Sequence, residues 1–322
     1  FFSRYKEGRG WYQSSIEPYG PIALDPAAAV LHYGQALFEG MKAFRTAEDY
    51  FVLFRPQEHL QRMNASARRM MMPEIDTHFV ESKLKKLIRV DARWVPKDPG
   101  TSLYMRPTMI ATQKTINLVV SNEYIFYVIM SPVGSLYKNG QKPKAILVSD
   151  TYTRSSVGGV GNVKTGGNYA ASMMAQSEAT KQGYDQVLWL DPVERRYVEE
   201  VGSMNIFFVM GDEIVTPELT GTILPGITRK SVLELGRAKG WKLIERKISI
   251  DEVTHAIAGG TCTEIFGTGT AAVISRVGKL KYKGKEFVVA DNPNGYAQKL
   301  YEAITGIQRG RVPDELGWMT RI

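Results

Sequence analysis

The sequence predicts a mixed α/β or α+β fold in two domains, from its length, its order of elements and one turn-rich segment. The 322 residues suffice for about two compact units. Strand-like and helix-like segments are interleaved without a repeating strand–helix–strand period. The segment GSLYKNGQKP at 134–143 is rich in turn formers. We therefore expect a small N-terminal α/β domain at 1–133, an interdomain linker at 134–144 and a large C-terminal domain at 145–322.

In the N-terminal part, the β-rich run 50–54 predicts a strand that ends at Arg55-Pro56. From Gln57 onward, apolar residues recur at helical spacing, which predicts a helix. A second helix is expected over about 75–90, because Pro96, Pro99 and Gly100 follow it as turn signals. The segments 103–112 and 124–132 then have the composition of strands.

The C-terminal part begins with an expected strand at 145–149, a glycine-rich loop at 158–167 and a helix over about 168–182. Strands are expected at 185–191 and 204–210, and a helix at 229–239 is closed by Gly240. Further strands are expected around Glu264 and Val288, and a last helix over about 296–307.

Composition and charge argue against several classes of protein. The longest purely apolar run, 124–130, is far shorter than the roughly 18 residues of a membrane-spanning helix. The formal charge of +8 suggests nucleic acid, but the lysines at 83–86 and 279–285 occur at the spacing of solvated helix and strand faces. We therefore expect neither a membrane nor a nucleic-acid partner, and only a mild attraction of anionic substrates.

The cysteine and histidine content bears on metal sites and location. Cys262 is the only cysteine, which excludes an intrachain disulfide, and the four histidines are too scattered for a metal site. A reducing compartment fits best, so we expect a cytoplasmic protein. The chain opens on Phe1 without an initiator methionine, so we expect residues upstream to be missing, and an organellar leader stays open as an alternative.

Lys164 stands in the segment GNVKTGGNYAAS among glycines and small residues. A phosphate-binding P-loop is disfavoured, because Val163 occupies the position that requires glycine. A loop lysine without chemistry and a lysine that forms a Schiff base with an aldehyde cofactor both stay open. In the second case the small neighbours let a planar cofactor approach, and Tyr169 could place a phenol beside it.

Two turns have the composition of anion sites. GTGTAA at 267–272 fits a dinucleotide fingerprint, but the β-branched alternation after it predicts strands where that fingerprint requires a helix. LPGIT at 224–228 leads into a helix that we expect to begin near Arg229, and a helix N-terminus suits a phosphate. Taken alone, each turn is better explained as plain structure than as a binding site.

Glu199 and Glu200 precede a strand that is expected to be buried. Alternation along a strand predicts that the two side chains point to opposite faces, with one of them inside. A buried carboxylate requires a cation or a hydrogen-bond donor, and a protonated ring nitrogen would serve.

Seven segments together resemble branched-chain amino acid aminotransferases of the fold type IV class, the D-amino acid aminotransferase-like fold that binds pyridoxal 5′-phosphate. They are LHYGQALFEGMKAFR (31–45), FRPQEHLQRM (54–63), LYMRP (103–107), GGVGNVKTGGNYAAS (158–172), EEVGSMNIFF (199–208), LPGITR (224–229) and FGTGTAA (266–272). They occur in the family's order across nearly the whole chain. The resemblance implies transamination of leucine, isoleucine and valine with 2-oxoglutarate, as in amino-acid biosynthesis.

The resemblance also implies residue roles for the cofactor. Lys164 would carry the cofactor and move the substrate proton, Tyr169 would bind the phenolate oxygen, and Glu200 would pair with the ring nitrogen. The phosphate would be held by four residues: Arg62, Ile227, Thr228 and Thr270.

For the substrate, the resemblance implies that Tyr104 and the turn at Ala271 and Ala272 bind the α-carboxylate, and that Phe38 lines the apolar pocket. Arg106 and Tyr33 would receive the distal carboxylate of glutamate. Tyr33 and a loop near Ile116 would reach the neighbouring subunit's site, which implies a homodimer.

Three departures from the family pattern are visible. The redox CxxC of mammalian relatives is absent after GTGTAA, and Leu136, with Tyr137 adjacent, stands in place of a linker aromatic. We also expect the family's opening residues before Tyr5 to be truncated here. A D-amino acid aminotransferase or an aminodeoxychorismate lyase is the alternative within the fold, and a binding protein without turnover is another.

Overall fold

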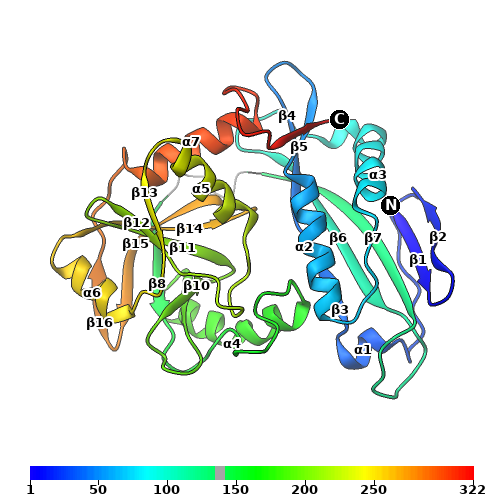
Figure 1. Cartoon of the computed structure of the whole chain (residues 1–322), viewed down its shortest axis with the longest axis horizontal. Coiled ribbons are helices and arrows are strands. Elements are labelled where there is room, and N and C mark those ends of the chain that lie inside the picture. The colour runs from blue at the N-terminus through cyan, green and yellow to red at the C-terminus, as the bar shows by residue number, and fades with distance from the viewer. Residues whose placement is uncertain (135–141) are drawn as a thin grey trace. The chain divides into compact units, whose positions relative to one another are not determined.

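The computed structural model describes residues 1–134 and 142–322, and these form two compact units (Figure 1). Unit 1 comprises residues 1–134, 163–167 and 306–322, and unit 2 comprises residues 142–162 and 168–305. The segments 163–167 and 306–322, which the sequence analysis assigned to the C-terminal domain, thus group with unit 1. Leu136 and Tyr137, where a departure from the family pattern is expected, and most of the expected linker lie outside the described residues.

Unit 1 is built on a sheet with the strand order β17-β5-β4-β6-β7-β1-β2, and β3 also pairs with β6. Its strands are β1 (Phe2–Lys6), β2 (Gly10–Ser15), β3 (Ala36–Phe38), β4 (Met41–Arg45), β5 (Phe51–Phe54), β6 (Ser102–Ala111), β7 (Glu123–Val133) and β17 (Met319–Arg321). Its helical segments are α1 (Ala29–Tyr33), α2 (Pro56–Arg69), α3 (Thr77–Val90) and the 3₁₀ turn η1 (Ala92–Trp94). The pairing of β17 with β5 explains why the C-terminus belongs to this unit.

The core of unit 1 lies between α2, α3 and one face of the sheet (Figure 1). Both helices are amphipathic, and α3 begins where the Asp76 carboxylate accepts a hydrogen bond from the N–H of Phe79. In β6, Leu103, Met105 and Met109 are fully buried in this core. Because side chains alternate along a strand, the residues between them, including Tyr104 and Arg106, project from the opposite face.

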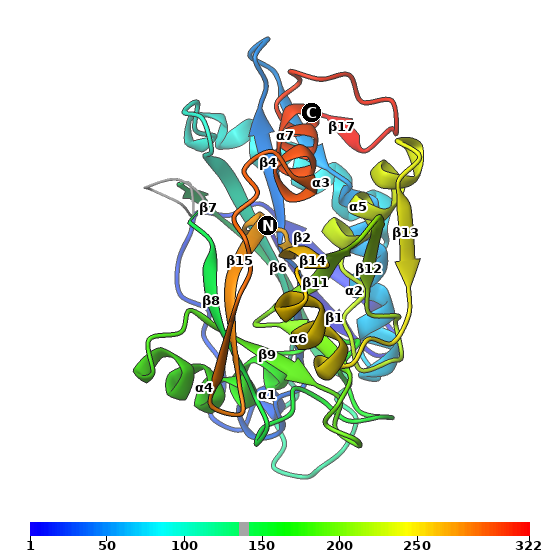
Figure 2. The same ribbon diagram turned by 90° about the vertical axis from the view of Figure 1, so that its left-hand side faces the viewer.

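Unit 2 is built on a sheet with the order β10-β9-β8-β15-β14-β11-β12-β13, and β16 pairs with β15. Its strands are β8 (Lys144–Val148), β9 (Gln186–Leu190), β10 (Val198–Val201), β11 (Met204–Met210), β12 (Glu213–Thr216), β13 (Lys242–Glu245), β14 (Cys262–Gly269), β15 (Val273–Tyr282) and β16 (Lys285–Val288). An additional pairing of β10 with β11 closes this sheet on itself. Figure 2 shows β8 beside β15, to which it is paired in parallel.

Four helices complete unit 2: α4 (Gly166–Lys181), whose first two residues belong to unit 1, α5 (Ile227–Ala238), α6 (Ile250–Ala258) and α7 (Tyr296–Gln308), whose last turn belongs to unit 1. The strands of this sheet contribute buried apolar side chains to one core, and Ile250, Val253 and Ile257 of α6 pack into it. Ala175 and Ala179 of α4 pack on Trp189 of β9. No helix in the described part of the chain is both long and apolar enough to cross a membrane.

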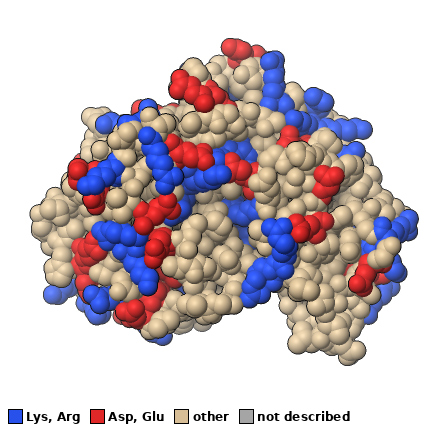
Figure 3. Space-filling view, viewed as in Figure 1, with Lys and Arg blue, Asp and Glu red and all other residues tan. Residues whose placement is uncertain are grey.

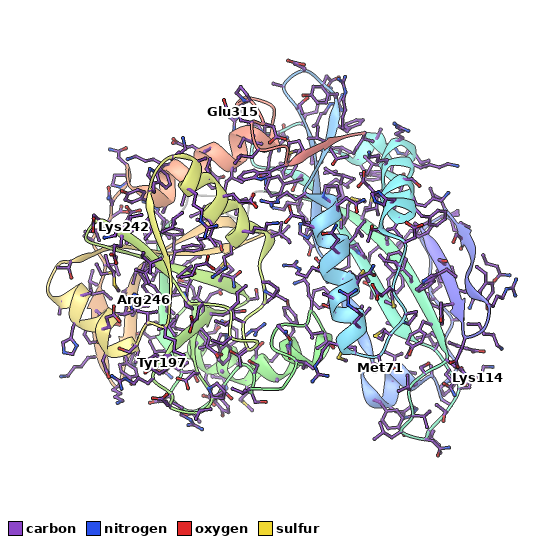
Figure 4. All side chains as sticks on the ribbon, in the orientation of Figure 1. Met71, Lys114, Tyr197, Lys242, Arg246 and Glu315 are labelled. Atoms are coloured by element: carbon purple, nitrogen blue, oxygen red, sulfur yellow. The ribbon has the colours of Figure 1, made fainter. Side chains whose placement is uncertain are left out.

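Basic and acidic side chains intermingle on the face drawn in Figure 3. Lys85 pairs with Glu81 at 2.9 Å, and Lys279 pairs with Glu286 at 2.9 Å. Lys242, which is labelled in Figure 4, pairs with Glu213 at 2.7 Å. The lysine clusters are thus solvated faces with local acidic partners, as their spacing predicted.

Candidate active site

Along the chain, Lys164 follows β8 and comes two residues before α4. Hydrogen bonds fix its backbone and that of the next residue. The N–H of Phe38 donates to the Lys164 carbonyl at 3.0 Å, and the Lys164 N–H donates to the Ser66 hydroxyl at 3.2 Å. The Thr165 hydroxyl donates to the Ala36 carbonyl at 2.8 Å. The lysine backbone is therefore held against β3 and α2 within unit 1.

The Lys164 amine has the properties of a nucleophile. Burial is the largest cause that lowers its pKa, to about 8, and Arg62 and Arg106 lower it further against the opposing effect of Glu39. Its Nζ atom lies 4.7 Å from the centre of the Phe38 ring. About a tenth of the amine is thus unprotonated at pH 7, far more than for a lysine of ordinary pKa, and attack on an aldehyde requires this neutral form.

Arg62 projects from α2 into the same part of unit 1. It is buried, and its guanidinium forms an ion pair with Glu39, with Nε 2.7 Å from Oε1. The sequence alone indicates no role for Glu39.

Tyr104 and Arg106 project from the same face of β6. The Arg106 Nη2 donates to the Tyr104 hydroxyl at 2.8 Å, and the guanidinium carbon lies 4.7 Å from the centre of the Phe38 ring. Arg106 Nε is buried without a hydrogen-bond partner among the described residues. A Cβ atom at Gly40 would come within 2.1 Å of the Tyr104 oxygen, so only glycine admits this arrangement. The cluster offers a phenol and a cation to a carboxylate.

Tyr33 of α1 lies against the loop between β6 and β7. Its hydroxyl donates to the carbonyl of Ile116. Ile116 and Leu118 are 71% and 81% exposed. Lys114, labelled in Figure 4, pairs with Asp25 at 3.3 Å and ties the start of this loop to the segment before α1.

Glu200 is 2% exposed on β10 of unit 2, and both of its oxygens have partners. Oε1 accepts from the N–H of Leu224 at 2.7 Å, and Oε2 lies 3.0 Å from Nε of Arg154. The Arg154 Nη1 also donates to the carbonyls of Thr222 and Gly161, at 2.7 Å and 3.0 Å. The carboxylate is therefore fixed in a buried position with a paired charge.

The prediction that only one of the two glutamates is buried is wrong. Glu199 is 4% exposed, and its Oε1 accepts a hydrogen bond from the Thr222 hydroxyl. The pairing of β10 with β9 shifts register between Val198 and Val201, so the two glutamates lie in a bulge. A bulge breaks strict alternation, and both carboxyl groups receive hydrogen bonds from the segment 222–224.

Replacing Glu199 with glutamine is expected to stabilise the protein more at high pH than at low pH. Burial is the main cause that raises the Glu199 pKa from 4.5 to about 7. Because the folded state holds this proton more tightly, wild-type stability falls as pH rises from about 4.5 through 7. Between pH 5 and pH 8 the variant should gain roughly 2 kcal/mol on the wild type in urea unfolding. The exposed Glu194→Gln is the control, and equal pH profiles for Glu199→Gln and wild type would refute the expectation.

Tyr169 and Glu200 line the same cavity of unit 2, which has a volume of about 650 Å³. Arg154 and Leu224 also border it. Tyr169 lies in the first turn of α4, close in sequence to Lys164. The cavity thus combines a phenol with a fixed carboxylate.

The turn before α5 has the geometry of an anion site. The helix begins at Ile227, two residues earlier than expected, so Ile227 and Thr228 occupy its first two positions. Gly226 precedes it without a side-chain cap, which leaves these N–H groups for a ligand. Asn205 Nδ2 donates to the Leu224 carbonyl at 2.9 Å, and a Cβ at Gly226 would come within 2.0 Å of the Asn205 oxygen.

The segment GTGTAA is the end of β14 followed by a turn. Thr270, Ala271 and Ala272 form that turn, and β15 begins at Val273. No helix follows, so the structure rejects the dinucleotide interpretation, as the sequence pattern predicted.

Each unit by itself carries groups that suit pyridoxal phosphate. Unit 1 supplies an amine of lowered pKa and a buried arginine. Unit 2 supplies an uncapped helix N-terminus and a cavity lined by Tyr169 and Glu200. Sequence reasoning missed Glu39, Arg154 and Asn205. Glu39 and Asn205 lie inside motifs chosen for other residues, whereas Arg154 lies outside every motif and had no signal in the sequence. In the part of the chain that the structure describes, no three potential metal ligands are grouped.

Comparisons with known proteins agree with this chemistry. The family model described as amino-transferase class IV matches residues 36–280. The chain is 51% identical over 324 residues to branched-chain-amino-acid transaminase 1 of Bacillus subtilis (strain 168), with 100% of this chain and 91% of that protein covered.

Solved structures show the same fold. The branched-chain aminotransferase of Thermoproteus uzoniensis with norvaline has a TM-score of 0.80 at 25% identity, covering 99% of this chain and 98% of that chain. The T.th. branched-chain amino acid aminotransferase complexed with N-(5′-phosphopyridoxyl)-L-glutamate has a TM-score of 0.74 at 27% identity, covering 99% and 97%. The predicted fold class is confirmed. The chain belongs to the class IV aminotransferases, in the family of branched-chain amino acid aminotransferases.

Proposed function

We propose that the protein transfers the amino group of leucine, isoleucine or valine to 2-oxoglutarate, giving branched-chain 2-oxo acids and L-glutamate. The observation that carries this proposal is the Lys164 amine, whose pKa of about 8 suits both attack and proton transfer. Pyridoxal phosphate, when bound, supplies the aldehyde and the electron sink for the reaction.

Within this proposal Lys164 carries the cofactor and moves the proton from the substrate Cα. Tyr169 donates to the phenolate oxygen, and Glu200 holds the proton on the ring nitrogen. The phosphate is bound by a charge and by backbone and hydroxyl donors, from Arg62, Ile227, Thr228 and Thr270. The uncapped N-terminus of α5 supports the second and third of these assignments.

The substrate residues follow the same logic. Tyr104 and the turn at Ala271 and Ala272 bind the α-carboxylate, and Phe38 lines the apolar pocket. Arg106 and Tyr33 receive the distal carboxylate of glutamate. The contact of Arg106 with Phe38 supports this assignment, because it places a cation at the edge of an apolar surface.

We also propose a cytoplasmic homodimer in which Tyr33 and the loop near Ile116 reach the partner's site. The support is the exposed apolar character of that loop and its hydrogen bond to Tyr33. The unpaired Cys262 suits a reducing compartment.

The test is to measure the two half-reactions separately by cofactor absorbance. Wild-type protein should react with L-leucine and with L-glutamate, and not with D-amino acids. Reaction with D-alanine alone would favour the D-amino acid aminotransferase alternative. The similarity to two branched-chain aminotransferases of Bacillus subtilis argues against that alternative.

Replacing Arg106 with leucine should weaken the glutamate half-reaction far more than the leucine half-reaction. Only glutamate brings a second carboxylate to this cation, and leaving a charged group unpaired costs roughly 10²-fold or more in kcat/KM. The matched control is Arg89→Leu on the exposed face of α3. Equal losses for both substrates would assign Arg106 to the α-carboxylate or to structure.

A further inference from the structure

Glu39 is a buried carboxylate on which three groups of unit 1 converge. It follows β3 directly and is 0% exposed. Arg62 donates to it twice, from Nε to Oε1 at 2.7 Å and from Nη2 to Oε2 at 2.8 Å. His59 Nδ1 lies 3.1 Å from Oε2, and the N–H of Gly40 donates to the same oxygen at 3.1 Å.

The charges of this cluster are well defined. Burial alone would raise the Glu39 pKa, but Arg62 and the hydrogen bond from His59 outweigh it and hold the pKa well below its usual range. Burial lowers the pKa of His59 below its ordinary value. Near neutral pH the carboxylate is therefore ionised, the imidazole is neutral, and Nδ1–H must be the donor because a carboxylate only accepts.

The geometry constrains Arg62 more than a single ion pair would. A guanidinium is planar and rigid, so two hydrogen bonds through Nε and Nη2 fix the position of Nη1 as well. The Glu39 carboxylate is itself fixed by His59 and the Gly40 N–H, so the arginine is held by a group that cannot rotate away.

The charge of Glu39 has the wrong sign for a site that attracts an anion. A carboxylate in contact with Arg62 offsets part of the positive charge available to a phosphate. A buried arginine without such a partner, however, would be costly to fold and free to adopt several rotamers. The arrangement favours fixed geometry over maximal charge.

We propose that Glu39 is the positioning residue of the phosphate-binding arginine: with His59, it holds the Arg62 guanidinium in the orientation that receives the cofactor phosphate. This inference rests on the proposed assignment of Arg62 to that phosphate.

The test measures how much the phosphate group contributes to binding. The apoprotein is titrated with pyridoxal 5′-phosphate and with pyridoxal, which lacks the phosphate. The readout is the Kd of pyridoxal divided by the Kd of pyridoxal 5′-phosphate, a ratio that is large when the phosphate contributes strongly to binding. Glu39→Asp keeps the charge but shortens the side chain by one methylene. We expect the ratio to fall about tenfold in this variant, with pyridoxal affinity unchanged, a size typical of coupled neighbours.

Glu39→Gln decides the matter if Glu39→Asp does not fold. It keeps the shape but removes the charge and turns one acceptor into an amide donor facing Arg62. Positioning predicts a smaller ratio in this variant, whereas a purely electrostatic role predicts a larger one, because a negative charge near the phosphate is gone.

Arg62→Ala separates this inference from the proposed function. In its background, Glu39→Asp should have no further effect on the ratio, because Glu39 acts through the arginine. If Arg62→Ala lowers the ratio and Glu39→Asp does not, Glu39 does not position Arg62. If Arg62→Ala leaves the ratio unchanged, the phosphate assignment in the proposed function is wrong.

Discussion

Lys164→Ala is expected to lower the rate of transamination by at least about a thousandfold, because it removes both the nucleophile and the proton-transfer group. The backbone around Lys164 is held by Phe38, Ser66 and Ala36 and not by its amine, so the variant should fold. Initial rates with L-leucine and 2-oxoglutarate measure the effect.

The matched control is Lys86→Ala, which removes an exposed amine from α3 and should leave the rate unchanged. A Lys164→Ala protein that retains a tenth of wild-type activity would show that another group moves the substrate proton.

Glu200→Gln is expected to slow proton removal from the substrate by orders of magnitude while the cofactor still binds. A buried carboxylate keeps a proton on the ring nitrogen by stabilising its charged form, and glutamine removes that charge without changing the shape. The fixed position of Glu200, between Arg154 and the Leu224 N–H, gives the prediction its geometric basis. Single-turnover absorbance with L-leucine isolates this step.

Glu199→Gln is the internal control for Glu200→Gln and should change the single-turnover rate little. The reason is its raised pKa of about 7, which keeps the Glu199 carboxyl largely neutral below neutral pH, so the rates of both variants are compared at about pH 6. If Glu199→Gln is the slow variant, the roles of the two glutamates are exchanged. If neither variant is slow, the assignment of a carboxylate to the ring nitrogen fails.

Much of the fold could be predicted from local sequence. The predicted helices match α2, α3, α4 and α7 to within a few residues, and apolar periodicity supports α2 and α3. Short elements were missed, including α6, although Ser249 caps it by accepting from the N–H of Glu252. The pairing of β17 with β5 could not be predicted, because strand partners far apart in sequence leave no local signal.

The candidate site was predicted unevenly for the same reason. The glycines around Lys164 mark an accessible amine in the sequence itself. The partners of Arg62 and Glu200 are Glu39 and Arg154, which lie in distant segments and meet them only in the folded chain. The bulge at Glu199 and Glu200 depends on the register of β10 with β9, and alternation alone gave the wrong burial for Glu199.

The most direct test of the account is to locate the covalent attachment of the cofactor. Borohydride reduction of the holoprotein, followed by proteolysis and mass spectrometry, should place the reduced phosphopyridoxyl group on the peptide that contains Lys164. Treatment with L-leucine before the borohydride should prevent this attachment, because the amino acid converts the cofactor to its amine form. Attachment to any other lysine, or no attachment in a protein that turns over leucine, would contradict the central role of Lys164.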